Sequence, residues 1–193
     1  MLPLRMRRKL FAALISVAIA SIAALGQHLH WWQASTAPMQ TASANSYTID
    51  HFVDGDTIAV NMNGTIEKVR FIGVDTPETH KPDTPVQCYG PEAAAYTKKL
   101  IGNNRVRLEA DSKSTDRDRY NRLLRYVYIP NGTNVNEALI QTGHGFYYPY
   151  FPFTKSGEFA TAEQQAQAAH AGLWQACRPT PTDDGGYISN NQT

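Results

Sequence analysis

Two acidic side chains stand at the end of a predicted core strand. Residues 69–74 form an apolar run that is typical of a buried strand, and Asp75, Thr76, Pro77 and Glu78 follow it directly. Pro77 fixes its own φ, cannot donate to a sheet ladder and favours extended backbone at Thr76. We therefore predict that two carboxylates, three residues apart, lie on a stiff segment at the end of a strand.

A second acidic pair, Asp54 and Asp56, lies around a glycine in the sequence Asp-Gly-Asp-Thr. Carboxylates that crowd at strand ends repel one another unless a cation is present. Because these ligands are all oxygens, they favour a hard cation such as Ca²⁺ or Mg²⁺. The chemistry suggested by these residues is that of a divalent metal site.

The elements that must position these residues follow from turn signals and alternating hydrophobicity. Asp54-Gly55 and Asn63-Gly64 predict hairpin turns, and Pro91 and Gly102 predict the start and end of a helix. We expect strands over residues 46–53, 57–61, 66–74, 105–110 and 123–129, and helices over about 91–101, 134–142 and 157–171. This order predicts an α+β fold, a five-stranded OB-like β-barrel with three helices; the alternative is an unrelated α+β sandwich.

The segments outside this pattern differ in composition. A basic cluster followed by an apolar run predicts that residues 1–26 are a signal peptide or an N-terminal anchor. Residues 27–45 are expected to be a linker, 46–178 the folded domain, and 179–193 a disordered tail. We expect an exported protein, periplasmic or secreted, or tethered through residues 10–26 if the leader is not cleaved.

Charge and cysteine content narrow the options further. Four of the 18 Lys and Arg residues precede residue 10, so the rest of the chain has 14 basic against 17 acidic residues. This balance argues against nonspecific coating of nucleic acid, which normally needs a basic surface. Cys88 and Cys177 are the two cysteines, and in an exported chain they predict one disulfide; the alternative is two buried thiols.

Several motifs together closely resemble the staphylococcal nuclease (thermonuclease) family. They are DGDT, VRFIGVDTPET, YGPEA, DRYNRLLRYVY, NEALIQTG and a final GLW, and they span about residues 47–174. DGDT alone is weak, whereas the arginine five residues before the aspartate of DTPET, combined with a downstream R-Y-x-R, is specific. The resemblance implies an OB-like five-stranded barrel with three helices and Ca²⁺-dependent phosphodiesterase activity on DNA and RNA.

The resemblance also implies a role for particular residues. Asp56, Asp75 and the carbonyl of Thr76 are expected to bind Ca²⁺, and Glu78 to activate the attacking water as a general base. The residues expected to bind the substrate are Arg70 and Arg122 at the scissile phosphate, Arg119 and Tyr120 near a terminal phosphate, and Tyr148 or Tyr150 beside a base. Taken singly, the arginines could instead form salt bridges on a barrel rim, and the aromatic residues could be loop packing.

The chain departs from the family pattern at two places. The Tyr-Gly-Arg-Gly loop of the family is Tyr120-Asn121-Arg122-Leu123 here, and asparagine can replace a turn glycine because it tolerates left-handed backbone. The cysteine pair is absent from the staphylococcal archetype, and it would join the first helix to the last.

The predicted function is a Ca²⁺-dependent endonuclease that hydrolyses DNA and RNA and leaves 3′-phosphates, acting as a monomer without an obligate protein partner. The main alternative is a catalytically inactive OB-type module that binds single-stranded nucleic acid or protein. A third option is an envelope protein that uses Ca²⁺ structurally. The enzyme hypothesis requires both arginines and the carboxylates to meet at one pocket.

Overall fold

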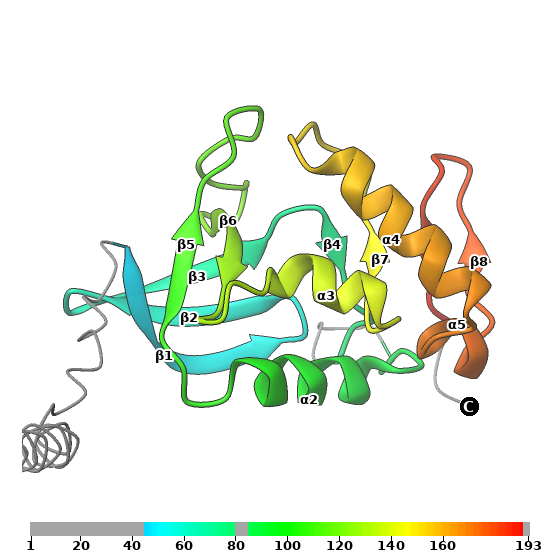
Figure 1. Ribbon diagram of the computed structural model, residues 1–193, viewed down its shortest axis with the longest axis horizontal. Helices are drawn as coiled ribbons and strands as arrows, with labels where there is room; N and C mark the ends of the chain where they lie inside the picture. Colours follow the sequence, from blue (N-terminus) through cyan, green and yellow to red (C-terminus); the bar gives the residue numbers. More distant parts are fainter. Residues whose placement is uncertain (1–44, 80–84, 191–193) are drawn as a thin grey trace, which may run out of the picture. The chain divides into compact units, whose positions relative to one another are not determined.

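The computed structural model of the chain describes residues 45–79 and 85–190. The predicted leader and the linker up to residue 44 lie outside the described residues. Five strands form a closed barrel in the order β1 (Ser46–Asp54), β2 (Thr57–Met62), β3 (Thr65–Phe71), β6 (Leu123–Tyr128) and β5 (Val106–Glu109) (Figure 1). Neighbouring strands are antiparallel except β3 and β6, which run parallel. The predicted α+β fold with an OB-like barrel is confirmed.

The predicted hairpin turns connect the first three strands. Asn63 and Gly64, between β2 and β3, both have positive φ angles, 57° and 97°, as a tight turn between twisted strands requires. The β2–β3 register runs without a shift from Thr57 opposite Arg70 to Met62 opposite Thr65. This register puts Arg70 beside the start of β2, directly after Asp56.

The third strand is shorter than predicted. It was expected to reach residue 74, but β3 ends at Phe71, and the chain turns at Gly73, where φ is 72°. A Cβ at Gly73 would lie 2.4 Å from the Phe153 ring, so the turn depends on a contact far along the sequence. The next two residues form β4 (Val74–Asp75), which pairs with β7 (Phe146–Tyr147) outside the barrel.

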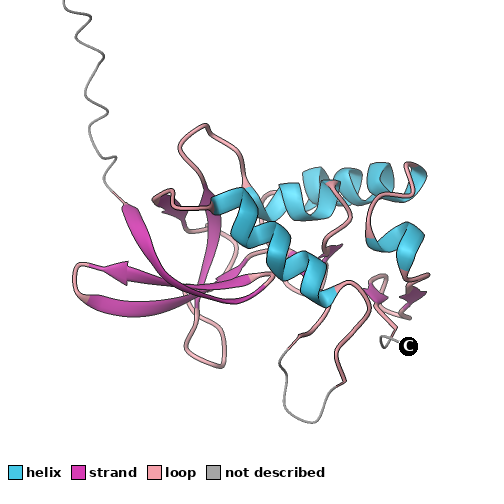
Figure 2. Cartoon of the chain, turned by 90° about the horizontal axis from the view of Figure 1, so that it is seen from below, coloured by secondary structure: helices cyan, strands magenta, loops and turns pink. Residues whose placement is uncertain are grey.

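Within the described residues, four helices accompany the barrel instead of the predicted three (Figure 2). They are α2 (Gly90–Ile101), α3 (Val135–Gln141), α4 (Ser156–Ala168) and α5 (Leu173–Ala176). The additional helix is a short turn after Gly172, whose positive φ of 51° separates it from α4. Within residues 45–79 and 85–190, none of the helices has the length and hydrophobicity of a membrane span.

The core joins the inward side chains of the barrel to the apolar faces of the helices. Ile58, Phe71 and Val127 of the strands are fully or almost fully buried, as are Leu139 of α3 and Phe159 of α4. Burying each such side chain contributes about 1.5–3 kcal/mol.

A buried asparagine attaches α3 to the barrel. The side chain of Asn136 accepts a hydrogen bond from the Val127 amide (3.0 Å) and donates to the carbonyls of Ile72 (2.9 Å) and Arg125 (3.1 Å). This polar clamp holds the end of β3 and β6 in a fixed relation to α3, because leaving such buried groups unpaired would be costly.

The C-terminal segment differs from the predicted disordered tail. Residues up to 190 are described, and they contain a small antiparallel sheet of β8 (Thr180–Pro181) and β9 (Tyr187–Ile188). The ring of Tyr187 packs against Phe146 (6.1 Å between centroids) and Trp174 (4.7 Å). The segment is therefore held by tertiary contacts that its polar composition does not reveal.

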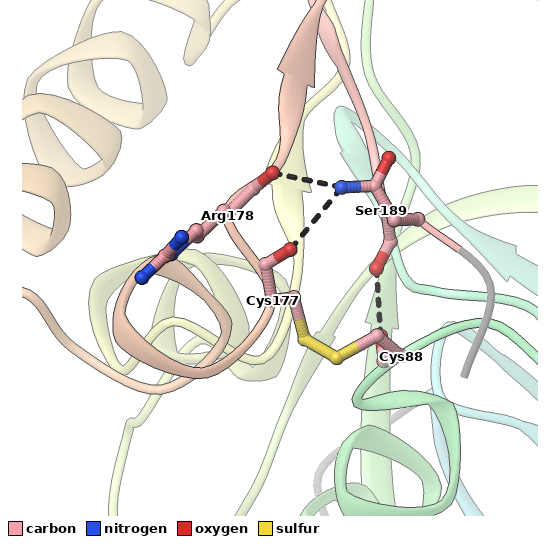
Figure 3. Close-up of a disulfide and its surroundings, with 5 residues drawn as sticks. Cys88, Cys177, Arg178 and Ser189 are labelled. Carbon is pink, nitrogen blue, oxygen red and sulfur yellow. Dashed lines mark hydrogen bonds between the residues drawn. A yellow bond between two sulfur atoms is a disulfide. The ribbon is translucent and has the colours of Figure 1, made fainter. Parts of the chain in front are cut away.

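The predicted disulfide is confirmed. Cys88, two residues before α2, bonds to Cys177 at the end of α5, and the Cα atoms are 5.7 Å apart (Figure 3). The bond connects the first of these helices to the last across 89 residues of sequence.

Candidate active site

The side chain of Arg70 is the centre of the site. It leaves β3 near the strand end and is 13% exposed. Its Nη2 atom lies 2.6 Å from Oδ1 of Asp75 and 3.2 Å from Oδ2 of Asp56, while Nη1 donates to the carbonyls of Phe71 (3.0 Å) and Val74 (2.5 Å). Burial acts to lower the pKa of Arg70, but Asp56 and Asp75 outweigh it, so the net pKa is raised.

Asp56 is held by two threonines. Its Oδ2 accepts hydrogen bonds from the amide (2.8 Å) and hydroxyl (3.1 Å) of Thr76, and Oδ1 accepts from the hydroxyl of Thr57 (2.9 Å). The segment around Asp56 and the segment around Thr76 approach closely because Gly55 has no side chain: a Cβ there would lie 2.7 Å from the Thr76 hydroxyl. The acidic segments predicted at two separate strand ends are thus in direct contact.

Asp56 and Asp75 are the carboxylates that could contact a divalent cation. One oxygen of Asp56 and one of Asp75 lie within 3.2 Å of the same Arg70 nitrogen, so the two carboxylates converge on one small volume. Within the described ranges, His, Cys, Asp and Glu side chains form no cluster of three or more that could hold a metal ion. The two carboxylates supply oxygen ligands of the kind that Ca²⁺ prefers, and Ca²⁺ commonly completes its coordination with backbone carbonyls and water.

Glu78 lies just beyond this pair on the same stiff segment. Its amide donates to Oε1 of Gln87 (2.8 Å), and its carbonyl accepts from the Gln87 amide (2.9 Å). The Glu78 carboxylate is close enough to Arg70 to contribute to the raised pKa of that guanidinium, after the larger effects of burial, Asp56, Asp75 and Tyr148. The carboxylate of Glu78, the predicted base, therefore interacts electrostatically with Arg70, more weakly than Asp56 and Asp75 do.

Arg122 comes from the loop between β5 and β6, and Asp118 fixes its direction. Oδ2 of Asp118 accepts from Nε of Arg122 (2.6 Å), and Oδ1 accepts from the amides of Tyr120 and Arg122 (both 2.9 Å). Burial acts to raise the pKa of Asp118, but the hydrogen bonds from Arg122 outweigh it, and the net pKa is lowered. Asn121 has a φ of 64°, which confirms that asparagine takes the left-handed position of the family's glycine.

Arg70 and Arg122 line the same pocket, which has a volume of about 590 Å³. The predicted residues Arg119, Tyr120 and Tyr148 also line it. The Arg119 and Arg122 guanidinium carbons lie 4.8 and 5.4 Å from the centroid of the Tyr120 ring, which is 64% exposed. The structure thus brings both arginines to one pocket, but the residues that line this pocket do not include Asp56, Asp75, Thr76 or Glu78. Asp56 and Asp75 are connected to the pocket through their contacts with Arg70.

Tyr150 does not line this pocket. Its ring lies 4.7 Å from that of Tyr148, and its hydroxyl pairs with the hydroxyl of Thr182 (2.9 Å) in the C-terminal segment. Of the two tyrosines proposed to flank a base, Tyr148 is therefore the one in position.

The pocket lining also contains residues that were not predicted as site residues, among them Lys113, Asp118 and Phe151. Phe151 is 65% exposed, and its signal was its place in an aromatic loop, whereas nothing distinguished Lys113 from other surface lysines. Two further arginines, one in the loop between β5 and β6 and one in β6, form ion pairs. Arg117 pairs with Glu67 (2.9 Å) and Arg125 with Asp116 (2.6 Å).

Comparison with known proteins is consistent with this geometry. Residues 68–176 match the family described as staphylococcal nuclease homologue. The chain is 40% identical over 142 residues to the thermonuclease of Staphylococcus hyicus, covering 72% of this chain and 81% of that protein. It is 36% identical over 174 residues to the thermonuclease of Staphylococcus intermedius, covering 87% and 99%.

A third relative is considerably longer. The SPbeta prophage-derived endonuclease YokF of Bacillus subtilis is 43% identical over 129 residues, which are 66% of this chain but 43% of that protein. The present chain therefore spans less than half the length of that curated relative. The matched family region includes the end of β3 with Arg70, the DTPE segment, the Arg122 loop and Cys88, whereas Asp56 and Cys177 lie outside it. From the barrel, the site and these matches together, the chain belongs to the staphylococcal nuclease family.

Proposed function

We propose that this protein is a nuclease, a Ca²⁺-dependent phosphodiesterase that hydrolyses DNA and RNA and leaves 3′-phosphate ends. The observation that carries the proposal is the shared pocket of Arg70 and Arg122, with Asp56 and Asp75 both in contact with Arg70. The nuclease names of the matched relatives support the same reaction class.

Phosphodiester hydrolysis requires compensation of the negative charge on the phosphate, which the arginines and a bound cation can provide. A phosphodiester is anionic and repels hydroxide, and further negative charge builds on its oxygens in the transition state. The guanidinium of Arg122, which uses only Nε for Asp118, can donate two parallel hydrogen bonds to phosphate oxygens through its Nη atoms. Arg70, whose Nη atoms pair with the carbonyls of Phe71 and Val74 and with Asp75, would supply fixed positive charge beside the phosphate. Asp56, Asp75 and the Thr76 carbonyl would hold Ca²⁺, which adds positive charge beside the phosphate.

Glu78 is proposed to orient the attacking water and accept its proton. A carboxylate within hydrogen-bond distance of water can act as a general base. Its place beside Arg70, on a segment stiffened by Pro77, suits that role. Tyr148, Arg119 and Tyr120 are proposed to hold the nucleotide on either side of the reacting phosphate.

The decisive experiment is a gel assay of the domain on plasmid DNA and on RNA, with Ca²⁺, with Mg²⁺ or with EGTA, followed by analysis of product ends. We expect both polymers to be cleaved with Ca²⁺, and EGTA to stop cleavage. Binding without cleavage would favour the inactive OB-type module, and activity in EGTA would refute the calcium dependence. We also propose that the protein is exported, which the leader and the disulfide support.

A further inference from the structure

The backbone of Glu78 is paired at both of its polar groups with one residue, Gln87. The Glu78 amide donates to the Gln87 side-chain oxygen (2.8 Å), and the Gln87 amide donates to the Glu78 carbonyl (2.9 Å). The pair is nine residues apart in sequence and half-buried. Because its amide and carbonyl are both hydrogen-bonded, the Glu78 backbone is held in place, and with it the direction of the Cα–Cβ bond from which the side chain extends.

The start of α2 closes the other side of the same segment. A Cβ at Gly90 would lie 2.8 Å from the Glu78 carbonyl oxygen and 3.1 Å from that of Pro77. The Glu78 backbone therefore lies directly against the helix start, an approach that a side chain at this position would prevent. Gln87 and Gly90 flank Cys88, so both contacts depend on where Cys88 is held.

Cys88 is held from outside by the C-terminal segment. Its amide donates to the Asn190 carbonyl (2.7 Å), its carbonyl accepts from the Ser189 hydroxyl (2.7 Å), and its sulfur bonds to Cys177. The Asn190 side-chain amide in turn donates to the carbonyls of Cys177 (3.2 Å) and Arg178 (2.9 Å) (Figure 3). Two hydrogen bonds and one disulfide thus connect Cys88 to residues 177–190.

We infer that Gln87 is a positioning residue for Glu78, and that residues 187–190 with the disulfide form a brace that holds Gln87 in place. The inference rests on the proposed role of Glu78 as the base. Catalytic geometry that shifts by about 1 Å can lower a rate about 100-fold, so a link of this kind is expected to affect turnover more than substrate binding.

The first test compares Gln87→Met with Gln87→Glu. Methionine matches the length of glutamine but lacks the oxygen that accepts the Glu78 amide, whereas glutamate keeps an oxygen. We expect Gln87→Met to lower kcat about 10-fold with KM within about twofold of wild type, and Gln87→Glu to restore most of kcat. Gln164→Met, at an exposed position of α4, is the matched control and should leave both constants unchanged.

The second test addresses the brace. Ser189→Ala removes the hydrogen bond to the Cys88 carbonyl, and we expect it to lower kcat about threefold alone but to add nothing in the Gln87→Met background. Fully multiplicative effects of the two changes would show that the C-terminal segment does not act through Gln87 and would overturn the brace. An unchanged kcat in Gln87→Met, or an equal loss in Gln87→Glu, would overturn the positioning role.

Amide hydrogen exchange separates failure of this inference from failure of the proposed function. The Glu78 amide should exchange faster in Gln87→Met than in wild type, and at the wild-type rate in Gln87→Glu and Gln164→Met. If the wild-type protein does not cleave nucleic acid, the proposed function fails, but this exchange pattern still decides whether Gln87 holds Glu78. Unchanged protection of Glu78 in Gln87→Met would refute the inference even in an active enzyme.

Discussion

The guanidinium of Arg70 lies 2.6 Å from the carboxylate of Asp75, although a strand end and a turn separate the two residues. The chain turns at Gly73, so Asp75 comes back to contact the side chain of Arg70, five residues earlier in the sequence. The same guanidinium reaches Asp56, which the β2–β3 hairpin places beside it. The buried guanidinium of Arg70 therefore connects the two acidic segments, at Asp56 and at Asp75, on which the proposed chemistry depends.

Replacing Arg70 by lysine is expected to lower kcat/KM about 100-fold, because one ammonium group cannot keep the contacts to the Phe71 and Val74 carbonyls and to both carboxylates that fix the positive charge in place. Cleavage of a defined oligonucleotide measures the effect. Arg107→Lys is the matched control, since Arg107 pairs with Glu109 (2.7 Å) at an exposed site on β5 and should tolerate the change. Near wild-type activity in Arg70→Lys would contradict the proposed role of Arg70 beside the phosphate.

Asp118→Ala should raise KM and lower kcat/KM about 10-fold, because Arg122 loses the partner that holds its Nε and the turn loses its amide acceptor. Steady-state kinetics on a short single-stranded substrate test this. Asp116→Ala is the control: Asp116 pairs with Arg125 and is 66% exposed, so its removal is expected to leave the kinetics unchanged. Equal effects of the two substitutions would argue against a specific role of Asp118.

Replacing both cysteines by serine should lower the free energy of unfolding by about 4 kcal/mol, because the disulfide closes a long loop and restricts the unfolded chain. Urea denaturation of wild type and Cys88→Ser/Cys177→Ser, each monitored by tryptophan fluorescence, gives the difference. A loss below about 1 kcal/mol would show that the bond adds little beyond the surrounding hydrogen bonds.

Glu163 should make stability depend on pH. This glutamate of α4 is 6% exposed, and burial raises its pKa to about 7, although the Tyr147 amide, which donates to it (2.9 Å), acts to lower it. Between its ordinary pKa of 4.5 and about 7, the folded state binds more protons than the unfolded state, so this residue makes stability fall as pH rises.

Glu163→Gln keeps an acceptor for the Tyr147 amide but does not ionise. We expect it to be more stable than wild type above pH 7, by on the order of 1–2 kcal/mol, with the advantage disappearing near pH 4. Thermal unfolding across pH 4–8 tests the sign. Exposed Glu158→Gln on the same helix is the control, and identical pH profiles for Glu163→Gln and wild type would contradict the effect of burial.

Local signals accounted for the features that depend on short stretches of chain. Asn63-Gly64 predicted its hairpin because few residue pairs accept two positive φ angles, and Asn121 was expected in left-handed backbone for the same reason. The third strand was predicted to continue to residue 74, whereas β3 ends at Phe71, because an apolar run does not indicate where the backbone turns. That turn depends on Gly73 meeting Phe153, 80 residues later.

The sequence by itself predicted the order of the five barrel strands and of the three longer helices, and favoured a disulfide between its two cysteines, since each depends on local composition, spacing or simple counting. The tertiary structure alone decided that Arg70 contacts both Asp56 and Asp75, that Tyr148 and not Tyr150 lines the pocket, and that the C-terminal segment folds back onto Cys88. These facts depend on packing between segments that are distant in the chain, where a few ångströms decide which groups meet and no local pattern records the outcome.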